Sequence, residues 1–134
     1  MSPHYLNKED HMTISEALHR ADELKPNTYT DLDKIRWLST LDGLIKTKII
    51  DTHEGGEDVT FKGYEVDTEL STELLVPAPY DHIYIHWLEA MIDYANDEYD
   101  RYQNTMEMYN SAWNAFENYY NRTHMPKGKK FKFF

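Results

Sequence analysis

The sequence contains no cysteine and only five glycines and five prolines among 134 residues. Without cysteine, the chain cannot form disulfides, thiolate zinc sites, iron–sulfur clusters or a cysteine nucleophile. Its glycines do not have the spacing of a phosphate-binding loop, a dinucleotide-binding turn or a serine nucleophile elbow. We therefore expect a protein that is not an enzyme and that uses no cofactor.

Long hydrophobic runs are also lacking. No stretch approaches the roughly 18 apolar residues of a membrane-spanning helix, and residues 1–10 lack the basic start and apolar core of a secretion signal. We therefore expect a soluble protein that is made in the cytoplasm and has no membrane contact. With 134 residues, 40% of them hydrophobic, the chain fits one domain with tails.

Basic residues are scarce outside the C-terminus. The chain has 24 acidic and 14 basic residues, a formal net charge of -10, and four of its lysines lie in the last eight positions. Residues 1–126 therefore carry 10 basic residues against 24 acidic ones. Because such a surface repels nucleic-acid phosphates, we do not expect sequence-specific binding of DNA or RNA.

Acidic residues concentrate in residues 51–76, which we call the acidic segment. Eight acids occur between Asp51 and Glu73, and Lys62 is the one basic residue among them. The carboxylates do not have the spacing of an EF-hand calcium loop, so a solvated charged loop is one interpretation. The other is an arm that contacts an adjacent protomer or lines a channel for DNA, with the candidate residues Glu54, Glu57, Asp58, Phe61, Tyr64 and Glu65.

Two short helices are predicted near the N-terminus. Thr13 and Glu16 have the spacing of a capping box, and apolar residues recur at helical spacing until a Lys-Pro pair ends the pattern. Thr30 precedes a second pattern of the same kind. We predict helices over residues 13–24 and 30–48, after a flexible leader, residues 1–12.

The rest of the chain predicts a hairpin and a long helical segment. Alternating residues on both sides of Gly63 indicate a small β-hairpin, with strand confined to residues 57–76. Residues 80–125 contain no glycine or proline and predict one long helix, or two helices separated near Gln103 and Asn104. The expected core residues of this segment are Trp87, Leu88, Met91, Trp113 and Phe116.

The predicted fold class is therefore mainly α. It is a helical bundle with two short N-terminal helices, a long C-terminal helical segment and a small β-hairpin insertion. The predicted organisation is a leader (1–12), a helical domain (13–126) that contains the acidic segment, and a C-terminal tail (127–134).

One pair of histidines has the spacing of metal ligands. His82 and His86 stand one helical turn apart, with Glu89 and Asp93 on the following turns. The residue after the first histidine is not the glutamate that the zinc-protease pattern requires. A packed or surface pair of histidines is the better interpretation, so we expect no metal site.

The C-terminal tail combines basic and aromatic residues beyond the helix-ending Pro126, and we expect it to hang free of the domain. A disordered solubilising tail is one interpretation, but three phenylalanines suit that role poorly. We therefore predict that the tail docks to a partner. The candidate residues are Lys127, Lys129, Lys130, Phe131, Lys132, Phe133 and Phe134.

Four phrases of the sequence, taken as a set, resemble a known family. The set is similar to the phage and prophage head–tail connector proteins, the adaptors that sit beneath the portal of the capsid. It spans most of residues 13–126 and contains no catalytic motif. The phrases are TISEAL (13–18) with LKPN (24–27), KIRWLSTLDG (34–43), ELLVPAPYD (73–81) and YYNRTHMP (119–126).

The resemblance implies a helical protomer of a ring with twelvefold symmetry, at the head–tail junction of the virion. Such a ring extends the DNA channel and joins the portal protein to a stopper or tail-completion protein. DNA passes through it without sequence-specific binding. The basic and aromatic tail suits an arm that inserts into the portal.

A second interpretation comes from another class of protein. A small acidic phage protein can mimic DNA and occupy a nucleic-acid-binding protein of the host. Such an inhibitor would be a monomer or dimer with a basic partner, whereas an adaptor forms a ring. An enzyme that uses His82, His86 and Glu89 would require a metal ion in stoichiometric amount.

Overall fold

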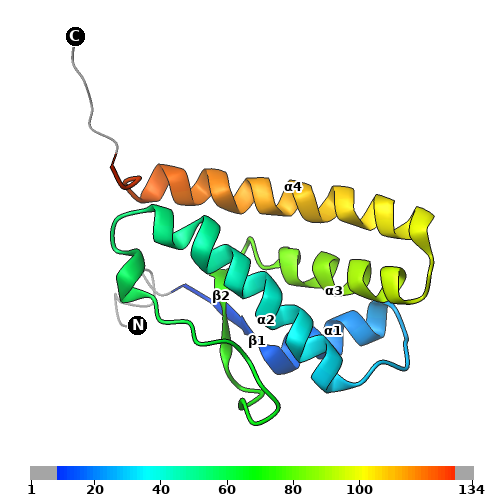
Figure 1. Ribbon diagram of the computed structural model, residues 1–134. Coiled ribbons are helices and arrows are strands. Elements are labelled where there is room, and N and C mark those ends of the chain that lie inside the picture. Colours follow the sequence, from blue (N-terminus) through cyan, green and yellow to red (C-terminus); the bar gives the residue numbers. More distant parts are fainter. Residues whose placement is uncertain (1–8, 129–134) are drawn as a thin grey trace, which may run out of the picture.

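The computed structural model describes residues 9–128. Four α-helices form a bundle, and a two-stranded antiparallel sheet lies beside it (Figure 1). The predicted fold class, mainly α with a small β element, is confirmed. Within residues 9–128, no helix combines the length and the apolar character needed to cross a membrane. The elements are β1 (His11–Thr13), α1 (Ile14–Leu24), α2 (Asp31–Lys48), the 3-10 turns η2 (Ile50–Thr52) and η3 (Gly56–Asp58), β2 (Glu73–Pro77), α3 (His82–Ala95) and α4 (Tyr99–Thr123).

The two N-terminal helices begin where their capping residues predict. The Thr13 side chain accepts a hydrogen bond of 3.1 Å from the Glu16 amide, and the Thr30 side chain accepts one of 3.1 Å from the Asp33 amide. Each bond satisfies a backbone N–H that has no partner within its helix. The helices predicted over residues 13–24 and 30–48 are therefore confirmed.

The small sheet differs from the predicted hairpin. β2 pairs with β1, the segment immediately before α1, and the register places His11 opposite Pro77 and Thr13 opposite Glu73. The prediction that strand is confined to residues 57–76 is therefore wrong. The two strands are far apart in sequence, so no local alternation of residues could reveal their pairing.

The chain between η3 and β2 forms neither helix nor strand. Gly63 adopts a left-handed φ of 88°, which would suit the turn of the predicted hairpin, but the residues on either side of it form no strands. The Tyr64 amide then donates to the Ser39 hydroxyl of α2 at 2.9 Å. Because this amide bonds to a helix, it is not available to a strand ladder.

The pairing of β1 with β2 also shortens the leader. His11 and Met12 belong to β1, and the Met12 side chain is buried in the core. The predicted leader of residues 1–12 therefore extends too far at its C-terminal end. Residues 1–8 lie outside the described residues.

The long C-terminal pattern forms two helices. The break between α3 and α4 lies at residues 96–98, not near Gln103 and Asn104 as predicted. Asp97 occupies the break with a φ of 61°, a left-handed conformation that aspartate tolerates better than most residues. The chain therefore reverses, and α4 packs antiparallel along α3 (Figure 1).

The core lies where the apolar faces of the helices meet β2. Leu88 and Phe116 are fully buried, as predicted. We predict burial of Trp87, Met91 and Trp113 within or between protomers, but within the protomer all three are only partly buried. Trp87 and Trp113 pack against the edge of the core. The largest fully buried side chains are Tyr84, Phe116, Ile14, Leu38, Leu41, Ile45, Ile49, Leu74, Ile83, Leu88, Ile92 and Val76.

Phe116→Ala should lower the free energy of unfolding by about 3–5 kcal/mol, because it removes a ring that is fully buried. Met108 on the same helix is 56% exposed, so Met108→Ala should change the free energy of unfolding by less than about 0.5 kcal/mol. Trp113→Ala should fall between these values. Urea unfolding followed by circular dichroism measures all three, and equal effects of Phe116→Ala and Met108→Ala would contradict the core position of Phe116.

Candidate functional site

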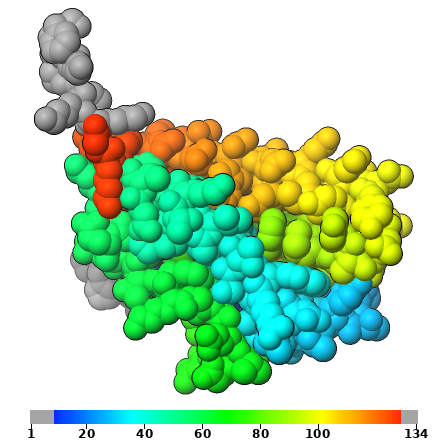
Figure 2. Space-filling view, viewed as in Figure 1, coloured from blue at the N-terminus to red at the C-terminus, as the bar shows by residue number. Residues whose placement is uncertain are grey.

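The acidic segment and the C-terminal end of the described chain lie together on the surface. Glu54, Glu57, Asp58 and Glu65 are all exposed. In Figure 2 the last described residues (red) lie against this part of the chain (green), and the Lys127 amine is 3.4 Å from a carboxylate oxygen of Glu57. The carboxylate of Glu57 and the start of the tail therefore share one end of the molecule.

Backbone contacts hold the start of the C-terminal tail. The Glu54 amide donates to the Met125 carbonyl at 2.7 Å, and the Lys127 amide donates to the Thr52 carbonyl at 2.9 Å, on either side of an isolated antiparallel bridge. The expectation that the tail hangs free beyond Pro126 is therefore wrong for Lys127. The other candidate residues of the tail lie outside the described residues: Lys129, Lys130, Phe131, Lys132, Phe133 and Phe134.

Two candidate interface residues of the acidic segment pack within the protomer instead. Tyr64 is buried, and its ring meets that of Phe61 edge to face with the ring centroids 5.1 Å apart. Phe61 is half-buried, and its ring lies beside Gly43 of α2. The prediction that Tyr64 faces a neighbouring protomer or a channel is therefore wrong, whereas for the half-buried Phe61 it stays a prediction.

Tyr64 is held by Asp42, a carboxylate of α2 with no exposed surface. The Tyr64 hydroxyl and the Leu75 amide donate to one carboxylate oxygen at 2.5 and 3.1 Å. The Tyr84 hydroxyl donates to the other oxygen at 2.6 Å and accepts from the Val76 amide at 2.7 Å. This Asp42 cluster joins α2, the acidic segment, β2 and α3.

Burial raises the pKa of Asp42 from 3.8 to about 6, although the three hydrogen bonds to the carboxylate oppose that rise. Burial also raises the pKa of both tyrosines, and the negative charge of Asp42 raises it further. The tyrosines therefore stay protonated as donors. The cluster has no open approach and serves as a structural centre, not as a site for an acid or base reaction.

The Asp42 cluster predicts a pH dependence of stability. Between about pH 4 and pH 6 the folded chain binds a proton at Asp42 that the unfolded chain has released, so the contribution of this group to stability falls as pH rises. The stability of the wild type relative to Asp42→Asn should therefore decrease by up to about 3 kcal/mol from pH 4 to pH 7. Urea unfolding across this range tests it. A stability difference between the wild type and Asp42→Asn that is constant, or that grows with pH, would contradict the prediction.

The histidine pair does not assemble a metal site. His82 is exposed, and the nearest nitrogen of His86 lies 4.0 Å from the Glu89 carboxylate. Asp93 is buried and is instead bonded to Lys25 and to the Thr105 hydroxyl. Among residues 9–128, no group of three or more potential ligands is placed to hold a metal ion.

Replacing both histidines, His82→Gln and His86→Gln, should change the free energy of unfolding by less than about 1 kcal/mol. His82 is exposed, and burial lowers the pKa of His86, so its neutral ring can be replaced by an uncharged amide. Urea unfolding and elemental analysis of the purified protein measure the two outcomes. A stoichiometric transition metal that disappears in the double variant would contradict this prediction.

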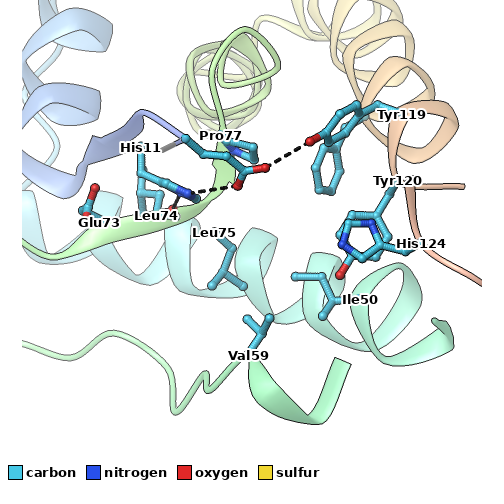
Figure 3. Close-up of a pocket in the computed structure, with 12 residues that line it drawn as sticks. His11, Ile50, Val59, Glu73, Leu74, Leu75, Pro77, Tyr119, Tyr120 and His124 are labelled. Atoms are coloured by element: carbon cyan, nitrogen blue, oxygen red, sulfur yellow. Dashed lines mark hydrogen bonds and ion pairs between the residues drawn. The ribbon is translucent and has the colours of Figure 1, made fainter. Parts of the chain in front are cut away.

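A pocket of about 360 Å³ lies between β2 and the C-terminal end of α4 (Figure 3). We call it the β2 pocket. Most of its walls are apolar, and two carboxylates and two histidines contribute polar groups. The lining residues are Glu9, His11, Ile50, Val59, Glu73, Leu74, Leu75, Pro77, Phe116, Tyr119, Tyr120 and His124.

Contacts between distant segments shape the β2 pocket. The Tyr119 hydroxyl donates to the Glu9 carboxylate at 3.0 Å, and the His11 ring is 2.7 Å from the Leu74 carbonyl (Figure 3). On the opposite side, the rings of Tyr120 and His124 stack with their centroids 3.8 Å apart. The pocket is therefore built by four parts of the chain: β1, β2, the region of η2 and η3, and α4.

The sequence does not reveal this pocket, because Glu9 and His11 fall within the predicted leader. Tyr119-Tyr120 and Leu74-Leu75 lie more than 40 residues apart, and nothing local in the sequence indicates that they line one pocket. Comparisons with protein-family models, curated proteins and solved structures found no match for this chain. The candidate site is therefore defined by geometry alone: an exposed acidic segment, a fixed start of a basic tail, and the β2 pocket between them.

Proposed function

We propose that this chain is a structural phage protein of the head–tail connector type. In this proposal it forms a ring under the portal, extends the DNA channel, and joins the capsid to the stopper or tail. Its place is the head–tail junction of the virion, its partners are the portal protein and a tail-completion protein, and it has no enzymatic activity. The twelvefold symmetry comes from the family resemblance.

The observation that carries the proposal is that the four phrases resembling the connector family pack against one another. Thr13 of the first phrase lies opposite Glu73 of the third in the sheet. Asp42 of the second phrase accepts a hydrogen bond from Leu75 of the third. Tyr119 of the fourth phrase lines the β2 pocket with the third phrase. A shared structural core explains why such phrases would occur together in one family.

The charge distribution supports a role around DNA. The exposed carboxylates of the acidic segment repel phosphates, which allows DNA to pass through a ring without sticking. The basic tail has the opposite charge and begins at one end of the bundle. A ring of such protomers would therefore present an acidic body together with many basic and aromatic arms.

Deleting residues 129–134 should leave the helical content unchanged, since the four helices α1 to α4 lie within residues 14–123. The same deletion should abolish attachment to DNA-filled heads. The tails of one ring bind together, so the effective concentration of the remaining tails rises once one tail is bound. Weak binding by each tail therefore gives tight attachment of the ring. Sedimentation of heads with labelled protein measures occupancy.

A matched pair of variants separates the two chemistries of the tail. Replacing the tail lysines with glutamine should weaken attachment mainly at low salt, because salt screens exposed charges. Replacing the phenylalanines with serine should weaken it at all salt concentrations. If the truncated chain occupies heads normally, the proposal that the tail binds the portal would be contradicted. The helices would then have to supply the portal-facing surface.

Imaging separates the adaptor from the DNA mimic. Electron microscopy of the chain mixed with the portal protein of the same phage should show rings that share the portal axis. A chain that stays monomeric or dimeric in this mixture, and that is captured instead by a basic nucleic-acid-binding protein, would favour the inhibitor.

A further inference from the structure

We propose that the β2 pocket is the docking site for the C-terminal tail of the same chain, residues 129–134, when no other partner holds that tail. This proposal goes beyond the connector function. It concerns the free protomer and does not require the portal to be the final partner of the tail.

The chemistry of the pocket matches that of the tail. Val59, Leu75 and Tyr119 are only partly buried by the rest of the protomer, so they offer apolar surface to an occupant. Glu9 and Glu73 add carboxylates to the same lining, and both are exposed. The tail offers the complementary groups, which are Phe131, Phe133, Phe134, Lys129, Lys130 and Lys132.

The path of the chain brings the tail to the pocket. His124 lines the pocket, and Gly128 follows four residues later, so their Cα atoms are at most about 15 Å apart. The Lys127 amide is fixed to Thr52, two residues beyond the pocket residue Ile50. The last described residues therefore keep the start of the tail close to the pocket.

Gly128 and the length of the tail allow the return. Gly128 has a φ of 73°, a left-handed conformation in which the chain can turn back. The six residues beyond it span up to about 20 Å when extended. A tail of this length, attached this close to the pocket, has a high effective concentration there, which favours its own chain over a second copy.

The leader is the competing occupant, because it enters the fold at Glu9. Residues 1–8 contain one basic residue, Lys8, and no run of aromatic residues. The tail therefore complements the carboxylates of the pocket better than the leader does. If the tail is docked in the free protomer, its phenylalanines are covered until a partner competes for them.

Spin labelling tests the proposal on the full-length chain. The protein has no cysteine, so Lys130→Cys creates a single attachment point for a nitroxide. The label should strongly broaden the NMR methyl signals of Leu74 and Leu75 in the pocket. It should leave the methyl signals of Leu24, at the far end of α1, unchanged. Dilution into unlabelled protein should not alter the result, because the contact is within one chain.

Two variants provide the controls. Val59→Lys places a repelling charge in the pocket and should abolish the broadening at Leu74 and Leu75. Leu70→Lys makes the same change at a residue that is 43% exposed and outside the pocket, and should preserve the broadening. A variant with serine at the three tail phenylalanines should also abolish the broadening, and it changes none of the described residues. This variant therefore tests the proposal even if Val59→Lys does not fold.

The remaining outcomes overturn the proposal. Broadening confined to the acidic residues 54–58 would show an electrostatic contact without docking. Broadening that depends on a mixture of labelled and isotope-enriched chains would assign the tail to a second copy. Broadening of the pocket from a label at Ser2→Cys, and not from the tail, would assign the pocket to the leader.

Discussion

The fold depends on a buried carboxylate without a cationic partner in the described chain. Asp42 lies inside α2, and its charge is balanced by two tyrosine hydroxyls and one backbone amide. Removing a carboxylate from water is costly unless its oxygens accept hydrogen bonds. The three donors come from the loop around Tyr64, from β2 and from α3, so the carboxylate is satisfied only when all three are in place. One side chain thus fixes the arrangement of four parts of the chain.

The candidate site depends on the same interaction. The Leu75 amide that bonds to Asp42 belongs to β2, and the Leu75 side chain lines the β2 pocket. On the other edge of β2, β1 brings His11 and Glu9 to the pocket and Glu9 reaches Tyr119 of α4. The surface that we propose as the docking site of the tail is therefore supported from behind by the hydrogen bonds of the Asp42 cluster.

The parts of this structure that could be predicted are those set by neighbouring residues. Thr13 and Thr30 cap helices by accepting hydrogen bonds from amides three residues away. Because the partners are so close in sequence, these caps can be predicted from the sequence. The β1–β2 pairing joins residues about 60 positions apart, and Tyr64 turns inward because of Asp42, so neither leaves a local signal. The α3–α4 break rests on Asp97, whose left-handed φ needs no glycine.

Several basic residues of the domain are held in ion pairs and are largely buried. Lys25, Lys34 and Lys46 pair with Asp93, Asp22 and Asp51, and the three lysine side chains are only 16%, 3% and 15% exposed. Each pair removes one positive and one negative charge, so the net charge is unchanged, and seven basic residues of residues 1–126 remain outside these pairs against 21 acidic ones. In the proposed docking, this acidic excess would attract the basic tail. Any partner that takes the tail must offer more than negative charge, and grooves that also accept the phenylalanines would satisfy that requirement.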